Sequence, residues 1–258
     1  MKIYGYVDRG PNKVECEDRV LIGDNILADG YLEKEVDKAD NILIAVADGV
    51  GGNKGGACAS VMAVDGIRIL NRRESLVVPD IKIAIENINN NILNSSIQTP
   101  SLSNMATTLS GLVMNQHTTV LFHVGNTRIY SYKQPYLRKR TQDNTTINTL
   151  LQSGSITPEE AINSSIKNEL DACLGGGNTR YASKLLVEDG ERITSNTDFI
   201  FLCSDGVHDF VPLEQLEDLL GEKKSAKEIC SDIVITAREN GSRDDISIII
   251  YDLVDQFG

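Results

Sequence analysis

The chain has 258 residues, 41% of them hydrophobic, and its formal net charge is -12 because 37 acidic side chains outnumber 25 lysines and arginines. This balance excludes a nucleic-acid-binding role, since an acidic surface repels a phosphate backbone. No apolar run approaches the ~20 residues that span a bilayer, so we expect no membrane contact. The length allows a substantial core, and no Pro-, Gly- or Ser-rich linker divides it, which predicts one domain over residues 1–258.

Apolar runs and their spacing predict the secondary structure in chain order. The predicted strands cover residues 2–7, 19–27, 41–47, 107–115, 118–124, 127–132, 136–141, 184–187, 199–203 and 246–253. The predicted helices cover residues 57–72, 80–93, a short segment from residue 157, 212–220 and 225–239. In the second helix, Ile81, Ile85, Ile88 and Ile92 recur at helical spacing and predict a buried face.

The order of these elements predicts an α+β fold. The four strands between residues 107 and 141 have connections so short that they predict antiparallel meanders. Two pairs of helices stand apart from the strands in the sequence, which predicts antiparallel sheets covered by helices.

The cysteines and the start of the chain indicate the compartment. The five cysteines are widely spaced and include no CxxC pair, so they predict reduced thiols rather than disulfides or a zinc site. The first residues enter strand-like sequence without an apolar signal region. Both features predict a cytoplasmic protein.

Asp48 follows an apolar run and precedes Gly49. Glycine lets another group approach the main chain closely, and a carboxylate beside a carbonyl oxygen suits a hard cation. Asp205 stands in the same position after a second apolar run. The alternative interpretation is an ordinary Asp-Gly turn, which we expect at Asp29 and Asp189.

Two acidic pairs, Glu17-Asp18 and Asp244-Asp245, each precede a predicted strand. Carboxylates gathered at one place repel one another and raise one another's pKa unless cations neutralise them. Oxygen-only donors select hard ions such as Mg²⁺ or Mn²⁺, and the sequence offers no competing Cys/His set. A divalent metal site at the strand ends is therefore the favoured interpretation.

Six motifs in this order resemble those of metal-dependent protein serine/threonine phosphatases of type 2C, in their compact bacterial form. The motifs are KVECED at residues 13–18, DGVGG at 48–52, ATT at 106–108, VGNTR at 124–128, SDG at 204–206 and DDIS at 244–247. The resemblance spans almost the whole chain. It implies a four-layer α-β-β-α sandwich with two central antiparallel sheets, and a flap over residues 142–178 that borders the substrate groove.

The resemblance also implies two Mn²⁺ or Mg²⁺ ions between the sheet ends. A water activated between them would attack phosphorus in line, without a phosphoenzyme. The implied ligands are Asp48, which bridges both ions, the Gly49 carbonyl, Asp205 and Asp244, with Glu17 and Asp18 acting through metal-bound waters. Asp48, Asp205 and Asp244 are thereby the implied catalytic residues.

Three departures from the family pattern concern binding. Lys13 stands where the family usually has the arginine that binds the substrate phosphate, so the charge is kept and the bidentate fork is lost. Arg9 is a nearby substitute, and a solvated surface charge is the alternative interpretation of Lys13. Asn126 replaces an aspartate that helps to hold a third ion in many relatives, and a neutral amide puts that ion in doubt. Asp245 replaces an asparagine and is expected to hydrogen-bond within its loop.

Two further residue types have a functional and a plain interpretation. Cys16 replaces an asparagine and is expected to be a small buried residue rather than a reactive thiol. His208 is a candidate general acid, although a loop hydrogen bond is the favoured interpretation. His117 and His123 are expected to be ordinary turn and strand residues.

These observations favour an enzyme that hydrolyses phosphoserine and phosphothreonine on proteins, the targets of a cognate serine/threonine kinase. We expect it to act as a monomer. The alternative is a non-catalytic phosphatase-like module that binds phosphoproteins or regulates a partner, which Lys13 and Asn126 motivate. Retention of Asp48, Asp205 and Asp244 favours the enzyme. A phosphatase dedicated to one regulatory protein would share the chemistry and differ only in its substrate.

Overall fold

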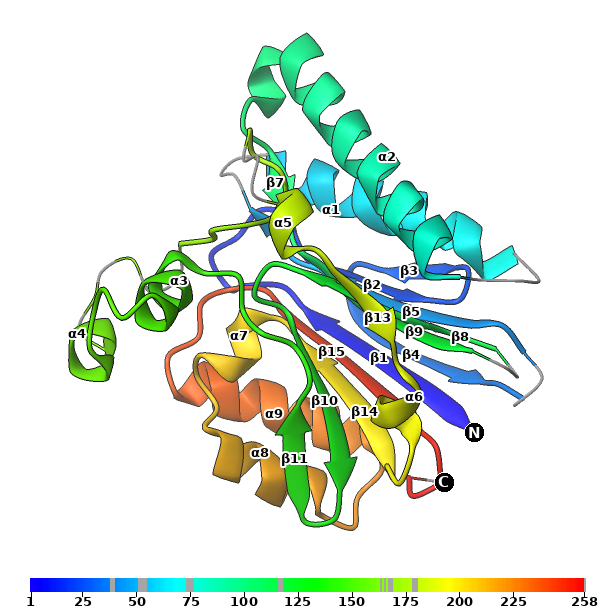
Figure 1. Ribbon diagram of the computed structural model, residues 1–258. Helices are drawn as coiled ribbons and strands as arrows, with labels where there is room; N and C mark the ends of the chain where they lie inside the picture. The colour runs from blue at the N-terminus through cyan, green and yellow to red at the C-terminus, as the bar shows by residue number, and fades with distance from the viewer. Residues whose placement is uncertain are drawn as a thin grey trace.

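The computed structural model describes most of the chain (Figure 1). The described residues are 1–37, 40–50, 55–72, 77–115, 118–162, 164, 166, 169–177 and 181–257. His117 and the glycines at 51 and 52 lie outside these ranges. Across the described residues, no helix is both long enough and apolar enough to cross a membrane.

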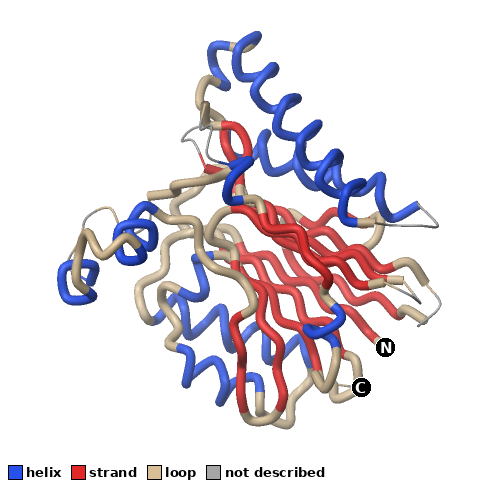
Figure 2. Tube along the Cα trace, in the orientation of Figure 1, coloured by secondary structure: helices blue, strands red, loops and turns tan. Residues whose placement is uncertain are grey.

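Two six-stranded antiparallel sheets form the centre of the molecule (Figure 2). In spatial order, the first sheet contains β11 (Tyr136–Lys139), β10 (Arg128–Lys133), β14 (Phe199–Cys203), β15 (Ile246–Asp252), β1 (Lys2–Asp8) and β4 (Gly30–Glu35). The second contains β13 (Leu186–Asp189), β9 (Thr119–Val124), β8 (Leu109–Met114), β5 (Ile42–Ala47), β2 (Arg19–Ile22) and β3 (Asn25–Leu27). A small third sheet contains β12 (Leu174–Gly175), β7 (Ala106–Thr107) and β6 (Gly49–Val50).

The longer helices form two outer layers (Figures 1 and 2). The second sheet is covered by α1 (Gly55–Arg68) and α2 (Val78–Gln98), and the first by α8 (Leu213–Leu220) and α9 (Ala226–Glu239). The shorter helices are η1 (Ile69–Arg72), η2 (Pro100–Leu102), α3 (Thr146–Gln152), α4 (Pro158–Ile162), α5 (Tyr181–Lys184), α6 (Glu191–Thr194) and α7 (Asp205–His208). The predicted four-layer α-β-β-α sandwich is confirmed.

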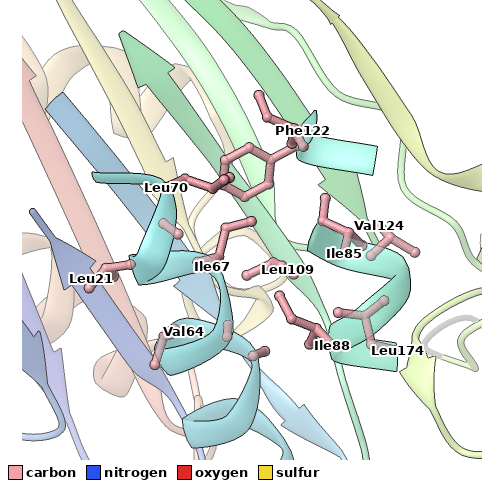
Figure 3. Close-up of a cluster of buried hydrophobic side chains, with 14 of the residues drawn as sticks. Leu21, Val64, Ile67, Leu70, Ile85, Ile88, Leu109, Phe122, Val124 and Leu174 are labelled. Carbon is pink, nitrogen blue, oxygen red and sulfur yellow. The ribbon is translucent and has the colours of Figure 1, made fainter. Parts of the chain in front are cut away.

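Three apolar clusters fill the space between the four layers. One lies between the two sheets. Another lies between the first sheet and its helices α8 and α9. The third lies between the second sheet and its helices α1 and α2 (Figure 3). In α2, the four isoleucines at positions 81, 85, 88 and 92 are all buried, which confirms the predicted helical face.

One predicted strand and one predicted meander are divided in the structure. The segment at residues 19–27 is a hairpin of β2 and β3 that turns at Gly23, where φ is +61°. The predicted meander between residues 107 and 141 is split, because β8 pairs with β9 in the second sheet whereas β10 pairs with β11 in the first. The chain crosses between the sheets at Gly125, where φ is +110° and a Cβ would overlap Thr108.

Other predicted elements are confirmed with small shifts of their ends. The short helix begins after Thr157, whose hydroxyl accepts a hydrogen bond from the Glu160 N–H at 3.2 Å while the Glu160 carboxylate accepts one from the Thr157 N–H at 2.8 Å. His123 is buried in β9, as predicted for a strand residue. The sequence pattern does not predict α3 or α7, because helices of seven and four residues are too short for an apolar periodicity.

We expect Ile85→Ala to lower the free energy of unfolding by about 2–5 kcal/mol, because it opens a cavity between α2 and the second sheet. Ile83 lies on the same helix and is 57% exposed, so Ile83→Ala is the matched control and should change this free energy by less than about 0.5 kcal/mol. Urea denaturation at a fixed metal concentration measures both. Equal effects would contradict the packing of α2.

Candidate metal centre

The predicted acidic residues lie at one end of the two sheets. Asp48 links β5 to β6, and Asp18 directly precedes β2, the antiparallel neighbour of β5. Asp205 directly follows β14, and Asp244 and Asp245 precede β15, the antiparallel neighbour of β14. Antiparallel pairing therefore brings the end of one strand beside the start of the next in each sheet. The structure places all five side chains at the same end of the sandwich.

The threonines of the ATT motif fix the main chain of Asp48. Its N–H donates to Thr108 Oγ1 at 3.0 Å, and its carbonyl accepts from Thr107 Oγ1 at 3.0 Å and from the Thr108 N–H at 2.9 Å. These bonds use the backbone groups and leave the carboxylate available. At Gly49, a Cβ would overlap the carbonyl of Gly56, so only glycine allows α1 to approach this loop so closely.

Burial and mutual repulsion act on three carboxylates of the centre. Burial, together with the nearby charge of Asp245, raises the pKa of Asp18 to about 7. Burial and the charges of Asp18 and Asp205 raise the pKa of Asp48 well above its ordinary value. Burial also raises the pKa of Asp205. Folding therefore brings together carboxyl groups whose ionised forms a bound cation would stabilise.

The Lys13 ammonium lies among three other carboxylate oxygens of the centre. Its Nζ is 2.5 Å from Asp244 Oδ1, 3.1 Å from Asp245 Oδ2 and 3.3 Å from Glu17 Oε2. Burial disfavours the charged form, but hydrogen bonds and charge interactions with Asp244 and Asp245 outweigh burial and raise the pKa of Lys13. In this structure, the side chain predicted to bind phosphate is an ion-pair partner of the acidic residues.

Asp245 organises the loop that carries Lys13. Its Oδ1 accepts from the Gly10 N–H at 2.8 Å, its Oδ2 accepts from the Glu17 N–H at 2.7 Å, and its side chain is fully buried. The prediction that Asp245 hydrogen-bonds within its own loop is wrong, because its carboxylate accepts from the loop between β1 and β2. Cys16, in the same loop, is buried, and burial raises the pKa of its thiol, which agrees with the predicted unreactive role.

Asn126 and His208 lie beside Asp205. The Asn126 Nδ2 donates to Asp205 Oδ2 at 3.0 Å, so the amide binds this carboxylate as a hydrogen-bond donor. His208 Nε2 lies 3.0 Å from the Asn126 carbonyl and donates to it. The local loop hydrogen bond predicted for His208 is wrong in its partner, because the bond joins His208 to the distant loop that carries Asn126.

The start of the predicted flap is anchored beside Asn126. The Gly125 N–H donates to Asn144 Oδ1 at 2.9 Å, and the Asn144 N–H donates to the Gly125 carbonyl at 2.7 Å. Arg128 donates hydrogen bonds to both carboxylate oxygens of Asp143. Burial raises the pKa of Asp143, but the bonds and charge of Arg128 outweigh burial and lower it to about 2. Beyond this anchor, α3 and α4 project from the same end of the sandwich as α7 (Figure 1).

Sequence reasoning missed this anchor and the role of the two threonines. The VGNTR motif singled out Gly125 and Arg128, but not the partners that they find in the following segment. An arginine on a strand followed by an Asp-Asn pair, at residues 143 and 144, was the available signal. A short run of threonines after Met105 was the corresponding signal for the support of Asp48.

The donor set fits a hard divalent cation. All the side-chain donors are carboxylates, and Glu17 Oε1 and Asp18 Oδ2 are buried without a hydrogen-bond partner. Within the described part of the chain, no three His, Cys, Asp or Glu side chains converge as metal ligands. Glu17, Asp244 and Asp245 instead contact the Lys13 ammonium, at distances of 2.5–3.3 Å that exceed the roughly 2.1 Å of a Mg²⁺–oxygen bond.

Comparison with known proteins identifies the family. Residues 22–246 match the family model described as "Protein phosphatase 2C". The chain is 30% identical over 224 residues to the serine/threonine phosphatase stp of Listeria welshimeri, which covers 83% of this chain and 86% of that protein. It is similar to the crystal structure of the serine/threonine phosphatase PstP/Ppp of Mycobacterium tuberculosis, with a TM-score of 0.79 and 25% identity over 98% of this chain and 99% of that one.

The fold and the acidic strand ends thus define a metal-dependent phosphatase. The chain belongs to the protein phosphatase 2C family. The predicted enzyme class, a serine/threonine protein phosphatase, is confirmed by this membership.

We expect the metal-free protein to lose stability as the pH rises from about 4 to about 7. The folded-state pKa of Asp18 is about 7 and the unfolded-state value is about 3.9, so in this interval the folded state holds a proton that the unfolded state has lost. In EDTA, Asp18→Asn should flatten the pH dependence of the unfolding free energy and exceed the wild type in stability at neutral pH. Urea denaturation across this interval measures both effects, and an unchanged slope would contradict the burial of the carboxylate.

Proposed function

We propose that the chain hydrolyses phosphoserine and phosphothreonine on proteins with two Mn²⁺ or Mg²⁺ ions. The proposed ligands are Asp48, the Gly49 carbonyl, Asp205 and Asp244, with Glu17 and Asp18 acting through waters. One observation carries this assignment: four strand ends bury acidic side chains close enough for Asp18, Asp205 and Asp244 to shift the pKa of Asp48.

The residues of the chain have distinct tasks in this mechanism. When bound, the ions supply positive charge that lowers the pKa of a water and offsets the charge of the phosphate. The main chain of Asp48 is held in place, because Thr107 and Thr108 bind both of its backbone groups. The oxygens of Glu17 and Asp18 that have no hydrogen-bond partner would accept hydrogen bonds from metal-bound waters. Lys13 is the proposed ligand of the phosphate.

Two ions, rather than three, agree with the surroundings of Asp205. Asn126 donates an N–H to Asp205 Oδ2 instead of offering a second carboxylate, and a neutral amide is a weak ligand for a third ion. A two-ion centre also has a precedent of the same fold, since the catalytic domain of PstP was solved in complex with 2 manganese ions. That domain superposes with a TM-score of 0.75 at 24% identity.

The proposal extends to the setting of the enzyme. We infer one phosphatase domain over residues 1–258, with the flap at residues 142–178 beside the substrate, acting as a cytoplasmic monomer on targets of a cognate serine/threonine kinase. A non-catalytic phosphoprotein-binding module is the second candidate. This module would bind phosphoproteins or regulate a partner, and the contacts of Lys13 favour the regulatory form, because this ammonium is paired with carboxylates rather than open to a substrate phosphate.

Hydrolysis of a phosphothreonine peptide separates the two candidates. We expect the wild type to turn over with Mn²⁺ or Mg²⁺ and to stop in EDTA, and we expect Asp205→Asn to reduce kcat on the order of 100-fold or more because a ligand charge is lost. Asp65→Asn, at an exposed position of α1, is the matched control and should keep the wild-type rate. Folded protein without turnover under any metal would favour the binding module.

A further inference from the structure

Lys13 is held in the acidic cluster by a defined loop. It lies between β1 and β2, and its backbone N–H donates to the Gly10 carbonyl at 3.0 Å, which closes a tight turn. The turn directs the side chain at Asp244, Asp245 and Glu17, and only 27% of that side chain is exposed. The ammonium therefore occupies a built position rather than a solvated one.

The two neighbouring aspartates hold this ammonium differently. Asp245 is fully buried and binds the backbone of the loop through both oxygens, so it cannot move without breaking the bonds from Gly10 and Glu17. Asp244 has a 45% exposed side chain and makes the shortest contact with Lys13 Nζ. Asp245 is therefore a fixed anchor, and Asp244 is the carboxylate that can exchange partners.

The guanidinium groups near this loop are directed elsewhere. Arg9 donates to the Val14 carbonyl at 2.8 Å. Arg238 pairs with Asp8 at 2.6 Å. Its contact with Asp244 is to the backbone carbonyl and not to the carboxylate. Among the ion pairs of the described residues, Lys13 is thus the cation that neutralises Asp244 and Asp245.

A divalent cation at Asp244 conflicts with this ion pair. The oxygen of Asp244 nearest to Lys13, Oδ1, belongs to a carboxylate that is also a proposed metal ligand. Two cations in contact with one carboxylate in a partly buried site repel each other strongly. The charge of the ammonium therefore opposes metal binding at Asp244, and any Lys13 ion pair that metal binding breaks lowers the affinity for the metal.

We propose that Lys13 is a tethered counter-cation that competes with the divalent metal for Asp244 and thereby sets the metal affinity of the centre. This inference rests on the proposed function, because it concerns the same site. In the metal-free protein the ammonium limits the repulsion among the carboxylates. When metal binds, the ammonium leaves Asp244 and remains tethered beside the centre through its loop.

Isothermal titration with Mn²⁺ tests the competition directly. We expect Lys13→Met to bind Mn²⁺ on the order of tenfold more tightly than the wild type, because no ion pair has to be broken. Lys82→Met, at an exposed position of α2, removes the same charge elsewhere and should bind like the wild type. Equal or weaker binding by a folded Lys13→Met protein would overturn the proposal.

A second measurement uses the wild type and does not depend on the folding of that variant. In protein labelled with ¹³C at lysine Cε, the Lys13 signal, assigned with Lys13→Gln, should shift as Mg²⁺ saturates the site. A signal that stays in place at saturation would overturn the exchange. If the wild type binds Mn²⁺ and hydrolyses the peptide, but Lys13→Met binds Mn²⁺ with the same affinity as the wild type, only this inference fails. If the wild type binds no metal, the proposed function fails as well.

Discussion

Repulsion between buried carboxylates is the interaction on which the functional end of this molecule depends. Asp18 and Asp48 are almost completely buried, the charge of Asp18 raises the pKa of Asp48, and the charge of Asp205 raises the pKa of both. Such an arrangement opposes folding unless positive charge accompanies it. Lys13 supplies one positive charge from within the chain, and bound divalent ions would supply the rest. The need for cations is therefore built into the folded state.

The rest of the fold resists this repulsion. Apolar clusters on both faces of each sheet hold the strands together, so the strand ends cannot separate. Backbone hydrogen bonds then fix the acidic residues individually: Thr108 holds the main chain of Asp48, and Asp245 holds the loop that precedes β2. Asn144 anchors the start of the predicted flap to the loop that carries Asn126.

Much of this arrangement could be predicted from the sequence, because local pattern encodes it. Apolar spacing predicted the buried face of α2, and acidic residues beside apolar strands predicted which carboxylates gather at one end of the sandwich. Contacts between distant segments had no local signal. The crossing between the sheets at Gly125 could not be predicted without knowing the strand partners, because β9 pairs with β8 and β10 pairs with β14. The ion pairs of Lys13 with Asp244 and Asp245 join residues more than 230 positions apart. The side chain that was predicted to bind phosphate therefore binds two carboxylates in this structure, and no local pattern indicates this.

The central claim is that the acidic strand ends form a metal centre, and anomalous diffraction from crystals grown with Mn²⁺ tests it most directly. The account predicts anomalous peaks within coordination distance of Asp48, Asp205 and Asp244, with the Lys13 ammonium moved away from Asp244. Ordered crystals with no peak at this end of the sandwich, or with Mn²⁺ bound only elsewhere, would contradict it.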